Sequence, residues 1–188
     1  MRDPDSILLQ EFLLSGDSAA YAAIVEKYHR PVYWLSYKFT HNSEDAQDVA
    51  QETFVRAYES LMKNSEREIL LKPWLMTICV NLCRNLAKKK KNFNFSDLER
   101  EEEDDSFVDR VQGKELNPRE KAAQVEVTEE VQTAVQKLPK KYQVVVELRY
   151  LQDLSYEEIA EVLRIPLNTV KVHLNRAKKT LKSYLAPL

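Results

Sequence analysis

Apolar residues recur every three or four positions along most of this chain, and that spacing constrains the fold more than any other feature of the sequence. Within residues 43–61 a single helix face would hold seven of them: Ala46, Val49, Ala50, Phe54, Ala57, Tyr58 and Leu61. The 188 residues include two glycines and seven prolines, so few positions interrupt a helix. The sequence therefore predicts an all-α protein with cores of modest size.

The distribution of charge divides the chain into three parts, although the net charge is only −2. Residues 93–120 hold ten Asp and Glu against four Lys and Arg, and have few periodic apolar positions. Such a composition is typical of a flexible linker. We therefore expect two small helical domains, at residues 1–92 and 121–188, joined by an acidic flexible linker at 93–120.

Several classes of protein are disfavoured by what the sequence lacks. No apolar run approaches the roughly 20 residues that cross a bilayer, and the N-terminus has no signal-peptide core, so we expect a cytoplasmic protein. Cys79 and Cys83 lie four residues apart in a helical stretch, and the three His are scattered. The sequence therefore predicts no disulfide framework, no metal site and no cofactor.

The C-terminal segment has the signals of two short helices joined by a tight turn. Ser155, with Glu158 three residues later, is typical of a capping box that opens the first helix. Pro166 ends that helix, and Asn168 is the expected N-cap of the next. Four apolar residues then follow at i, i+4, i+7 and i+11: Val170, Leu174, Ala177 and Leu181. Two such helices, the second basic, predict a helix-turn-helix.

The outward side of that second helix predicts its ligand. With the apolar stripe in the core, its N-terminal turns would present four side chains to base edges: Lys171, Val172, Asn175 and Arg176. Further side chains would lie against phosphates: His173, Lys178, Lys179 and Lys182. No Asp or Glu occurs in residues 164–182, so duplex DNA is the expected anion; the alternative is a helix that is basic only for solubility. His173 has no second ligand one turn away and predicts no metal site.

The helix expected after residue 43 has an acidic outer face, formed by Asp45, Asp48 and Glu52 with Gln51 alongside. Acids in a first helical turn complement the helix dipole, which explains Glu44 and Asp45 without any function. Glu52 lies too far along the helix for that explanation. The face therefore predicts a docking site for a basic partner helix, with a merely solvated face as the alternative.

A third helix is expected in "KPWLMTICVNLCRNLAKKKK", with its apolar stripe turned inward: Leu75, Ile78, Cys79, Leu82 and Leu86. Its outer face would then hold Thr77, Asn81, Arg84, Asn85 and Lys88. Amides read base edges, cations hold phosphates, and Trp74 at the helix start would support an unstacked base. The alternatives are a core position for Trp74 and a solvated helix end for the lysines.

Three stretches of the sequence resemble the extracytoplasmic-function (ECF) group of bacterial RNA polymerase sigma factors. They are "YHRPVYWLSYKFTHNSEDAQDVAQETFVRAY", "PWLMTICVNLCRN" and "LPKKYQVVVELRYLQDLSYEEIAEVLRIPLNTVKVHLNRAKKTL". Together they cover most of the chain apart from the first dozen residues and the acidic linker. The resemblance implies a protein that binds core RNA polymerase and directs promoter-specific initiation, with no catalytic residue and no small-molecule substrate.

The resemblance also assigns roles to the candidate faces. Asp45, Asp48, Gln51 and Glu52 match the face that binds a coiled coil of the polymerase β′ subunit. The N-terminal domain would melt the minus-ten element and capture a flipped base between the loop before Trp74 and the helix after it, where Asn81 and Asn85 match polar positions. Lys171, Val172, Asn175 and Arg176 match positions that read the minus-thirty-five element. An anti-sigma factor is a further partner that the family implies.

Two other interpretations of the sequence remain. One is a ligand-responsive helix-turn-helix transcription regulator, which would bind duplex DNA as a dimer and have a pocket among Tyr21, Tyr28 and Trp34. The other is a thiol enzyme that uses Cys79 or Cys83. It is disfavoured because Cys79 lies on the apolar stripe and Cys83 borders it, whereas a reactive thiol needs exposure and a nearby base.

Overall fold

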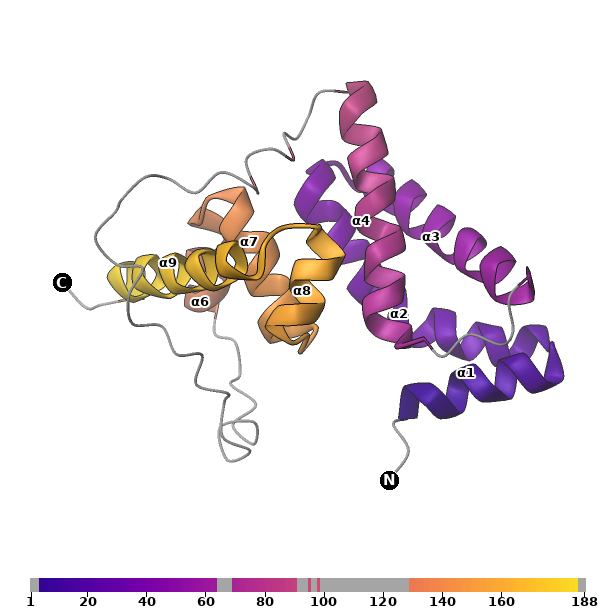
Figure 1. The fold of residues 1–188 in the computed structure, drawn as a ribbon. Coiled ribbons are helices and arrows are strands. Elements are labelled where there is room, and N and C mark those ends of the chain that lie inside the picture. Colours follow the sequence, from indigo (N-terminus) through magenta and orange to yellow (C-terminus); the bar gives the residue numbers. More distant parts are fainter. Residues whose placement is uncertain (1–3, 64–68, 91–94, 96–97, 99–128, 186–188) are drawn as a thin grey trace.

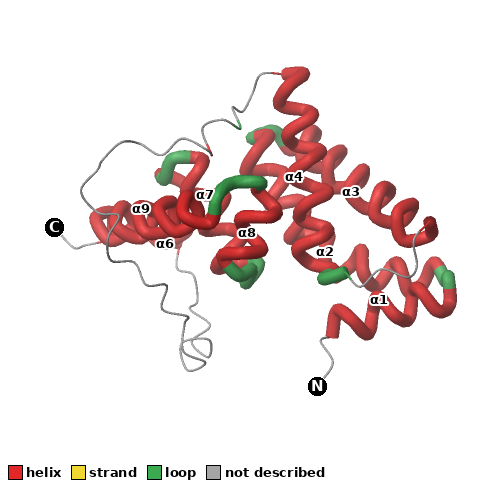
Figure 2. Tube along the Cα trace, in the orientation of Figure 1, coloured by secondary structure: helices red, strands yellow, loops and turns green. Residues whose placement is uncertain are grey.

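The computed structural model describes residues 4–63, 69–90, 95, 98 and 129–185, and the elements in these ranges are all helices (Figures 1 and 2). The N-terminal half consists of α1 (Pro4–Ser15), α2 (Ser18–Thr40), α3 (Ser43–Lys63) and α4 (Leu71–Lys90). The C-terminal half consists of α6 (Glu129–Lys137), α7 (Lys140–Val146), the π-helix η2 (Glu147–Leu151), α8 (Tyr156–Leu163) and α9 (Leu167–Leu185). The predicted all-α fold is confirmed. None of the described helices is long and apolar enough to span a membrane.

In the N-terminal half, α2, α3 and α4 pack against one another, and α1 covers part of α2. Helix α2 begins where the Asp17 carboxylate accepts a hydrogen bond from the Ala19 amide, and ends at His41 in the left-handed conformation. The predicted inward face of α3 is buried with one exception. The exception is Tyr58, which is 37% exposed although its ring packs on Tyr21 and on the buried Phe12.

In the C-terminal half, α8 and α9 form the predicted helix-turn-helix. The Glu158 amide donates to the Ser155 hydroxyl and the Ser155 amide donates to the Glu158 carboxylate, which completes the capping box. Helix α8 ends with Arg164 in the left-handed conformation, where the Ile165 amide reaches back to the Ala160 carbonyl. Helix α9 begins at Leu167, so Asn168 lies inside its first turn rather than at the predicted N-cap.

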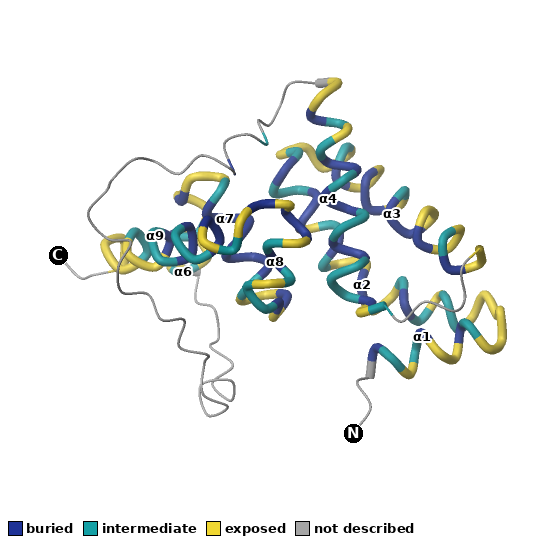
Figure 3. The backbone as a smooth tube through the Cα atoms, in the orientation of Figure 1, coloured by how far each residue is buried: buried dark blue, intermediate teal, exposed yellow. Residues whose placement is uncertain are grey.

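The two halves lie side by side, with α8 against α4 and α7 against α2 (Figure 1). Buried residues of both halves form one continuous hydrophobic cluster. Figure 3 shows this pattern along the backbone, with buried positions on the facing sides of α4, α7 and α8 and exposed ones on the outer surfaces. Of the segment predicted as a linker, Phe95 and Leu98 are described: Leu98 is fully buried and the Phe95 ring stacks on Phe39. The rest of 93–120 lies outside the described residues.

Candidate nucleic-acid interface

Helix α9 turns one apolar stripe into the core and leaves the other side to solvent. Val170, Leu174 and Ala177 are at most 2% exposed, so the face is fixed by burial. The side chains predicted to meet base edges are half-buried on the remaining surface, namely Lys171, Val172, Asn175 and Arg176. Lys178, Lys179 and Lys182 are exposed further along the helix. With no acidic residue in α9, this surface has the charge that a nucleic-acid backbone requires.

His173 was predicted on the phosphate side, and that prediction is wrong. Its side chain is fully buried, and its ring lies 5.5 Å from the ring of Tyr142 at an angle of 63°. His173 follows Val170 by three residues and precedes Ala177 by four, so it belongs to the same inward stripe. The sequence shows this spacing. His173 was nevertheless predicted at the surface because its imidazole is polar.

Helix α4 presents most of its predicted polar face to the surface. Asn85 and Lys88 are exposed, while Trp74 and Asn81 are half-buried. The Thr77 hydroxyl donates to the Pro73 carbonyl and is used within the helix. Part of the loop before α4, residues 64–68, lies outside the described residues, and with it part of the pocket expected for a flipped base.

Arg84 behaves differently from its neighbours on α4. Its Nη2 donates a 2.8 Å hydrogen bond to the carbonyl of Leu163, the last residue of α8. Its guanidinium also lies 4.8 Å from the centre of the Phe95 ring. The structure therefore separates Arg84 from Asn81, Asn85 and Lys88, because its side chain is engaged by the other half of the molecule.

Helix α4 also buries a second apolar stripe, whose residues were not among those predicted to face inward. Met76, Val80, Cys83 and Ala87 are at most 8% exposed, whereas Ile78 and Leu86 are only half-buried. The stripe is covered because α4 packs against α8 as well as α2 and α3. A helix that is buried on two sides shows no clean amphipathic pattern in its sequence. The burial of this second stripe is therefore explained by the contact with α8, which the sequence pattern does not reveal.

The acidic face of α3 is open to solvent at its centre. Asp48 and Gln51 are exposed, and Asp45 and Glu52 are half-buried. The Asn42 side chain caps the helix by accepting from the Asp45 amide. Glu52 accepts a 2.7 Å hydrogen bond from Arg56 Nε, so part of its charge is balanced within α3.

The residues proposed for a regulator's ligand pocket do not converge. Tyr28 is 2% exposed, and its hydroxyl donates to the Asp5 carboxylate inside the core. Trp34 is 42% exposed at the surface. Tyr21 donates to the Phe54 carbonyl and lines a shallow groove between α2 and α3 with Gln51 and Tyr58. No shared cavity therefore supports a small-molecule sensor built from these three side chains.

Both thiols are enclosed, which removes the basis for a thiol enzyme. Cys79 and Cys83 are 0% and 2% exposed, and Cys79 Sγ lies 3.2 Å from the Ser36 hydroxyl. The hydrogen bond with Cys79 and burial together raise the pKa of Cys83 well above its usual range. A buried thiol of this kind is a poor nucleophile.

Two family models match the chain, one in each half. The model of Sigma-70 region 2 matches residues 24–93, and the model of Sigma-70, region 4 matches residues 128–181. These matches define the class of protein as a sigma factor of the Sigma-70 type, with α2–α4 in region 2 and α6–α9 in region 4.

Two similar proteins show to which group of sigma factors the chain belongs. The ECF RNA polymerase sigma factor SigW of Bacillus subtilis is 33% identical over 174 residues, which cover 92% of this chain and 92% of SigW. The RNA polymerase sigma-H factor of Pseudomonas aeruginosa is 31% identical over 181 residues, covering 96% of this chain and 93% of that protein. The chain belongs to the ECF RNA polymerase sigma factors. It directs promoter-specific transcription and is not an enzyme, which confirms the function predicted from the sequence.

Two solved structures share the fold. CnrH, in complex with the cytosolic domain of CnrY, gives a TM-score of 0.59 at 23% identity, covering 97% of both chains. The sigma factor RpoE in complex with the anti-sigma factor NepR, from Bartonella quintana, gives 0.58 at 17% identity, covering 88% of this chain and 96% of that one.

Proposed function

We propose that α9 and α4 bind two separate elements of the promoter. In this proposal α9 enters the duplex of the minus-thirty-five element, with Lys171, Val172, Asn175 and Arg176 at the bases and Lys178 and Lys179 at the phosphates. Support comes from the buried stripe of α9, which leaves these side chains outward on a helix without acids. Arg and Asn are the side chains best suited to pair with guanine and adenine edges.

Helix α4 would bind the separated strand of the minus-ten element through Trp74, Asn81, Arg84, Asn85 and Lys88. The indole offers a stacking surface, the amides offer hydrogen bonds to base edges, and the cations offer charge for phosphates. The exposure of Asn85 and Lys88 supports this role. Arg84 differs from these residues, because its Nη2 already donates to the Leu163 carbonyl.

The face of α3 formed by Asp45, Asp48, Gln51 and Glu52 would dock the basic coiled coil of the polymerase β′ subunit. Binding to this larger machine and to the upstream duplex would supply free energy for unpairing and flipping bases, which costs a few kcal/mol. The observation that supports docking is that Asp48 and Gln51 are exposed on the side of α3 opposite its buried stripe, where a partner helix can reach them.

We also propose that the two halves work as separate domains, at 1–92 and 121–188, joined by the acidic segment 93–120, and that the protein acts in the cytoplasm. An anti-sigma factor is the expected regulator, because RpoE of Bartonella quintana, which shares the fold, was solved with one. The acidity of 93–120 would keep that segment away from DNA.

Reconstituted transcription tests the proposal. Core RNA polymerase plus this protein is expected to yield products from a defined subset of a random promoter library, and core polymerase alone is not. Products that are independent of template sequence, or no products, would reject the two promoter interfaces.

The docking face has its own test in polymerase capture. Replacing Asp48 and Glu52 by Lys reverses the charge of the face and is expected to reduce binding of core polymerase at least tenfold. A matched pair of exposed acids elsewhere, Glu11→Lys with Glu130→Lys, is expected to leave capture unchanged. Equal capture by both double variants would return the α3 face to the solvated interpretation.

A further inference from the structure

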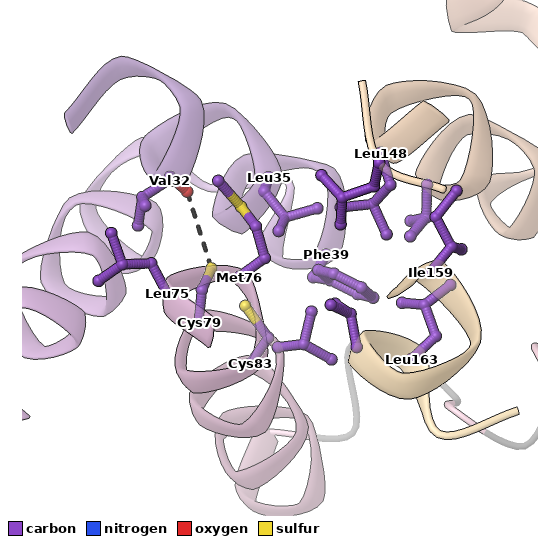
Figure 4. Close-up of a cluster of buried hydrophobic side chains, with 14 of the residues drawn as sticks. Val32, Leu35, Phe39, Leu75, Met76, Cys79, Cys83, Leu148, Ile159 and Leu163 are labelled. Carbon is purple, nitrogen blue, oxygen red and sulfur yellow. Dashed lines mark hydrogen bonds between the residues drawn. The ribbon is translucent and has the colours of Figure 1, made fainter. Parts of the chain in front are cut away.

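The inward side of α2 is fully used in packing. Val32, Leu35 and Phe39 are at most 2% exposed. Figure 4 shows the ring of Phe39 between side chains of α4 on one side and Leu148 and Leu163 on the other. Since the core occupies this side of the helix, the opposite side of α2 faces away from it and would ordinarily carry polar residues.

The opposite side of α2 carries aromatic rings instead. Arg30, Trp34, Tyr37 and the C-cap residue His41 follow at i, i+4, i+7 and i+11, so they share one side of the helix. The Tyr37 ring lies 5.8 Å from Trp34, 6.4 Å from Tyr33 and 6.2 Å from His41. Trp34 is 42% exposed, which is unusual for so large a ring. We call these four rings, Tyr33, Trp34, Tyr37 and His41, the aromatic stripe.

The stretch that holds the aromatic stripe is positively charged. Residues 27–43 contain three Lys and Arg and no Asp or Glu. Two of these cations are engaged, because Lys27 pairs with Asp5 and Lys38 acts on the buried carboxyl of Glu147. Arg30 is exposed and forms no ion pair with any residue that the structure describes. Its guanidinium is therefore available to an anionic ligand.

Helix α7 adds a second cation beside the stripe. It packs against α2, and its first residue, Lys140, is exposed. Partial burial and the nearby ammonium groups of Lys140 and Lys38 lower the pKa of His41. The imidazole is therefore neutral at pH 7, and it offers a flat ring, as the tyrosines do, rather than a charge.

We propose that the aromatic stripe, with Arg30 and Lys140 beside it, is a binding surface for single-stranded DNA, in which unpaired bases stack on Trp34 and Tyr37 while phosphates contact the cations. Such stacking accepts any base, because every base has a flat face. For a sigma factor the single strand at hand is a separated strand of the promoter. The inference goes beyond the proposed function, which places no part of the promoter on α2.

Charge and shape together distinguish this ligand from a protein helix. A basic helix, such as the one proposed to dock on the acidic face of α3, would be repelled by Arg30 and Lys140. An apolar helix would cover the rings but leave both cations without an anion. A single strand supplies flat bases and phosphates at once, so it suits the rings and the cations.

The chain has two tryptophans, Trp34 and Trp74, so the surfaces on α2 and α4 can be followed separately by fluorescence. In full-length Trp74→Phe the indole signal comes from Trp34 alone, and in full-length Trp34→Phe it comes from Trp74 alone. Stacked bases quench indole fluorescence. We expect oligo(dT) to quench the Trp34 signal to saturation, and added salt to reverse the quenching.

Stacking itself is tested by affinity. Trp34→Ala is expected to weaken binding of dye-labelled oligo(dT) by roughly fivefold or more, measured by fluorescence anisotropy, whereas Trp34→Phe keeps a ring and loses less. Tyr150→Ala, which removes a ring that is 45% exposed in η2, is the matched control and is expected to bind as the wild type does. Circular dichroism checks that each variant is folded.

The cation is tested by salt dependence. Arg30→Gln is expected to reduce the slope of the logarithm of the binding constant against the logarithm of salt concentration by about 0.7, the value for one phosphate contact on a single strand. Lys63→Gln, at the exposed last residue of α3, is expected to leave the slope unchanged. Equal slopes for Arg30→Gln and the wild type would overturn the contact between Arg30 and a phosphate.

The promoter as the source of the strand is tested in the holoenzyme. With core polymerase, Trp34→Ala is expected to shorten several-fold the lifetime of complexes on a template with a preformed bubble. An unchanged lifetime would show that the stripe does not hold the promoter strand, and would overturn that part of the inference.

The fluorescence outcomes separate this inference from the role proposed for α4. Quenching of Trp34, with or without quenching of Trp74, supports it, provided that Trp34→Ala weakens binding. Quenching of Trp74 alone would overturn it and leave the α4 proposal standing. If oligo(dT) leaves the Trp34 signal unchanged and a protein partner covers the stripe instead, core polymerase would protect Trp34 from quenching by acrylamide, and the inference would be wrong.

Discussion

At the scale of single residues, the side chain of Arg176 is the sharpest probe of how α9 reads DNA. It lies half-buried on the outward side, next to the buried Ala177. A bidentate contact with a guanine edge distinguishes one base from the others, whereas a phosphate contact distinguishes none. If Arg176 contacts a base, its removal weakens binding to some DNA sequences more than to others. If it contacts a phosphate, its removal weakens binding to all DNA sequences equally.

For Arg176→Ala we expect binding to the selected minus-thirty-five duplex to weaken by about 1–3 kcal/mol, with relaxed preference at one position. Competition binding across all single-base variants of that duplex measures both effects. Lys182→Ala, an exposed cation at the far end of α9, is expected to weaken all sequences alike. A uniform loss for Arg176→Ala would assign that side chain to the backbone.

Glu147 gives a second residue-scale prediction, this time in pH. Burial raises the pKa of its carboxyl in the folded protein, so the group stabilises the fold most when protonated, and this stabilisation is lost as pH rises through the folded pKa. Glu147→Gln does not titrate and keeps a hydrogen bond to Gln152. We expect the variant to be more stable than the wild type at pH 7 by on the order of 1 kcal/mol.

This stability difference should shrink as the pH falls towards the ordinary pKa of glutamate and below it. Urea unfolding of both proteins at several pH values measures it. A difference that stays constant with pH would mean that the carboxyl is not ionised at a cost in the folded state.

At the scale of elements, α8 depends on its capping box. The Ser155 hydroxyl accepts from Glu158 and the Glu158 carboxylate accepts from Ser155, which satisfies two amides that the helix leaves unpaired. Ser155→Ala is expected to lower the free energy of unfolding by about 1 kcal/mol. Thermal unfolding checks this value against Ser183→Ala, an exposed serine near the end of α9. Equal losses would mean that the cap adds no stability.

The same elements show how far the sequence predicts the structure. The capping box of α8, the inward stripe of α9 and most of the buried face of α3 were predicted correctly. Each of these features depends on residues only a few positions apart in the sequence. Contacts between distant segments were missed. Met76 and Val80 are buried because α4 packs on α8 as well as on its own half, and Arg84 leaves the polar face of α4 to reach Leu163. The prediction for His173 failed for a different reason. Its polar side chain suggested a surface position, whereas its spacing from Val170 and Ala177 indicates the buried stripe.

At the scale of the whole molecule, the halves that match Sigma-70 region 2 and region 4 share one hydrophobic core. A partner that binds one half can therefore also change the proportion of molecules in which the two halves are packed together. A partner that binds only the separated form favours opening by the difference in its affinity for the two forms.

The position of Phe39 between the halves limits how far they can be exchanged with those of relatives. A hybrid protein with its C-terminal half taken from another family member would have to present a hollow that fits this ring. A poor fit would expose apolar surface and leave the hybrid less stable or prone to aggregation, even with every promoter-reading side chain intact. Compatibility between the two halves is thus a constraint on sequence in its own right, separate from any constraint imposed by DNA.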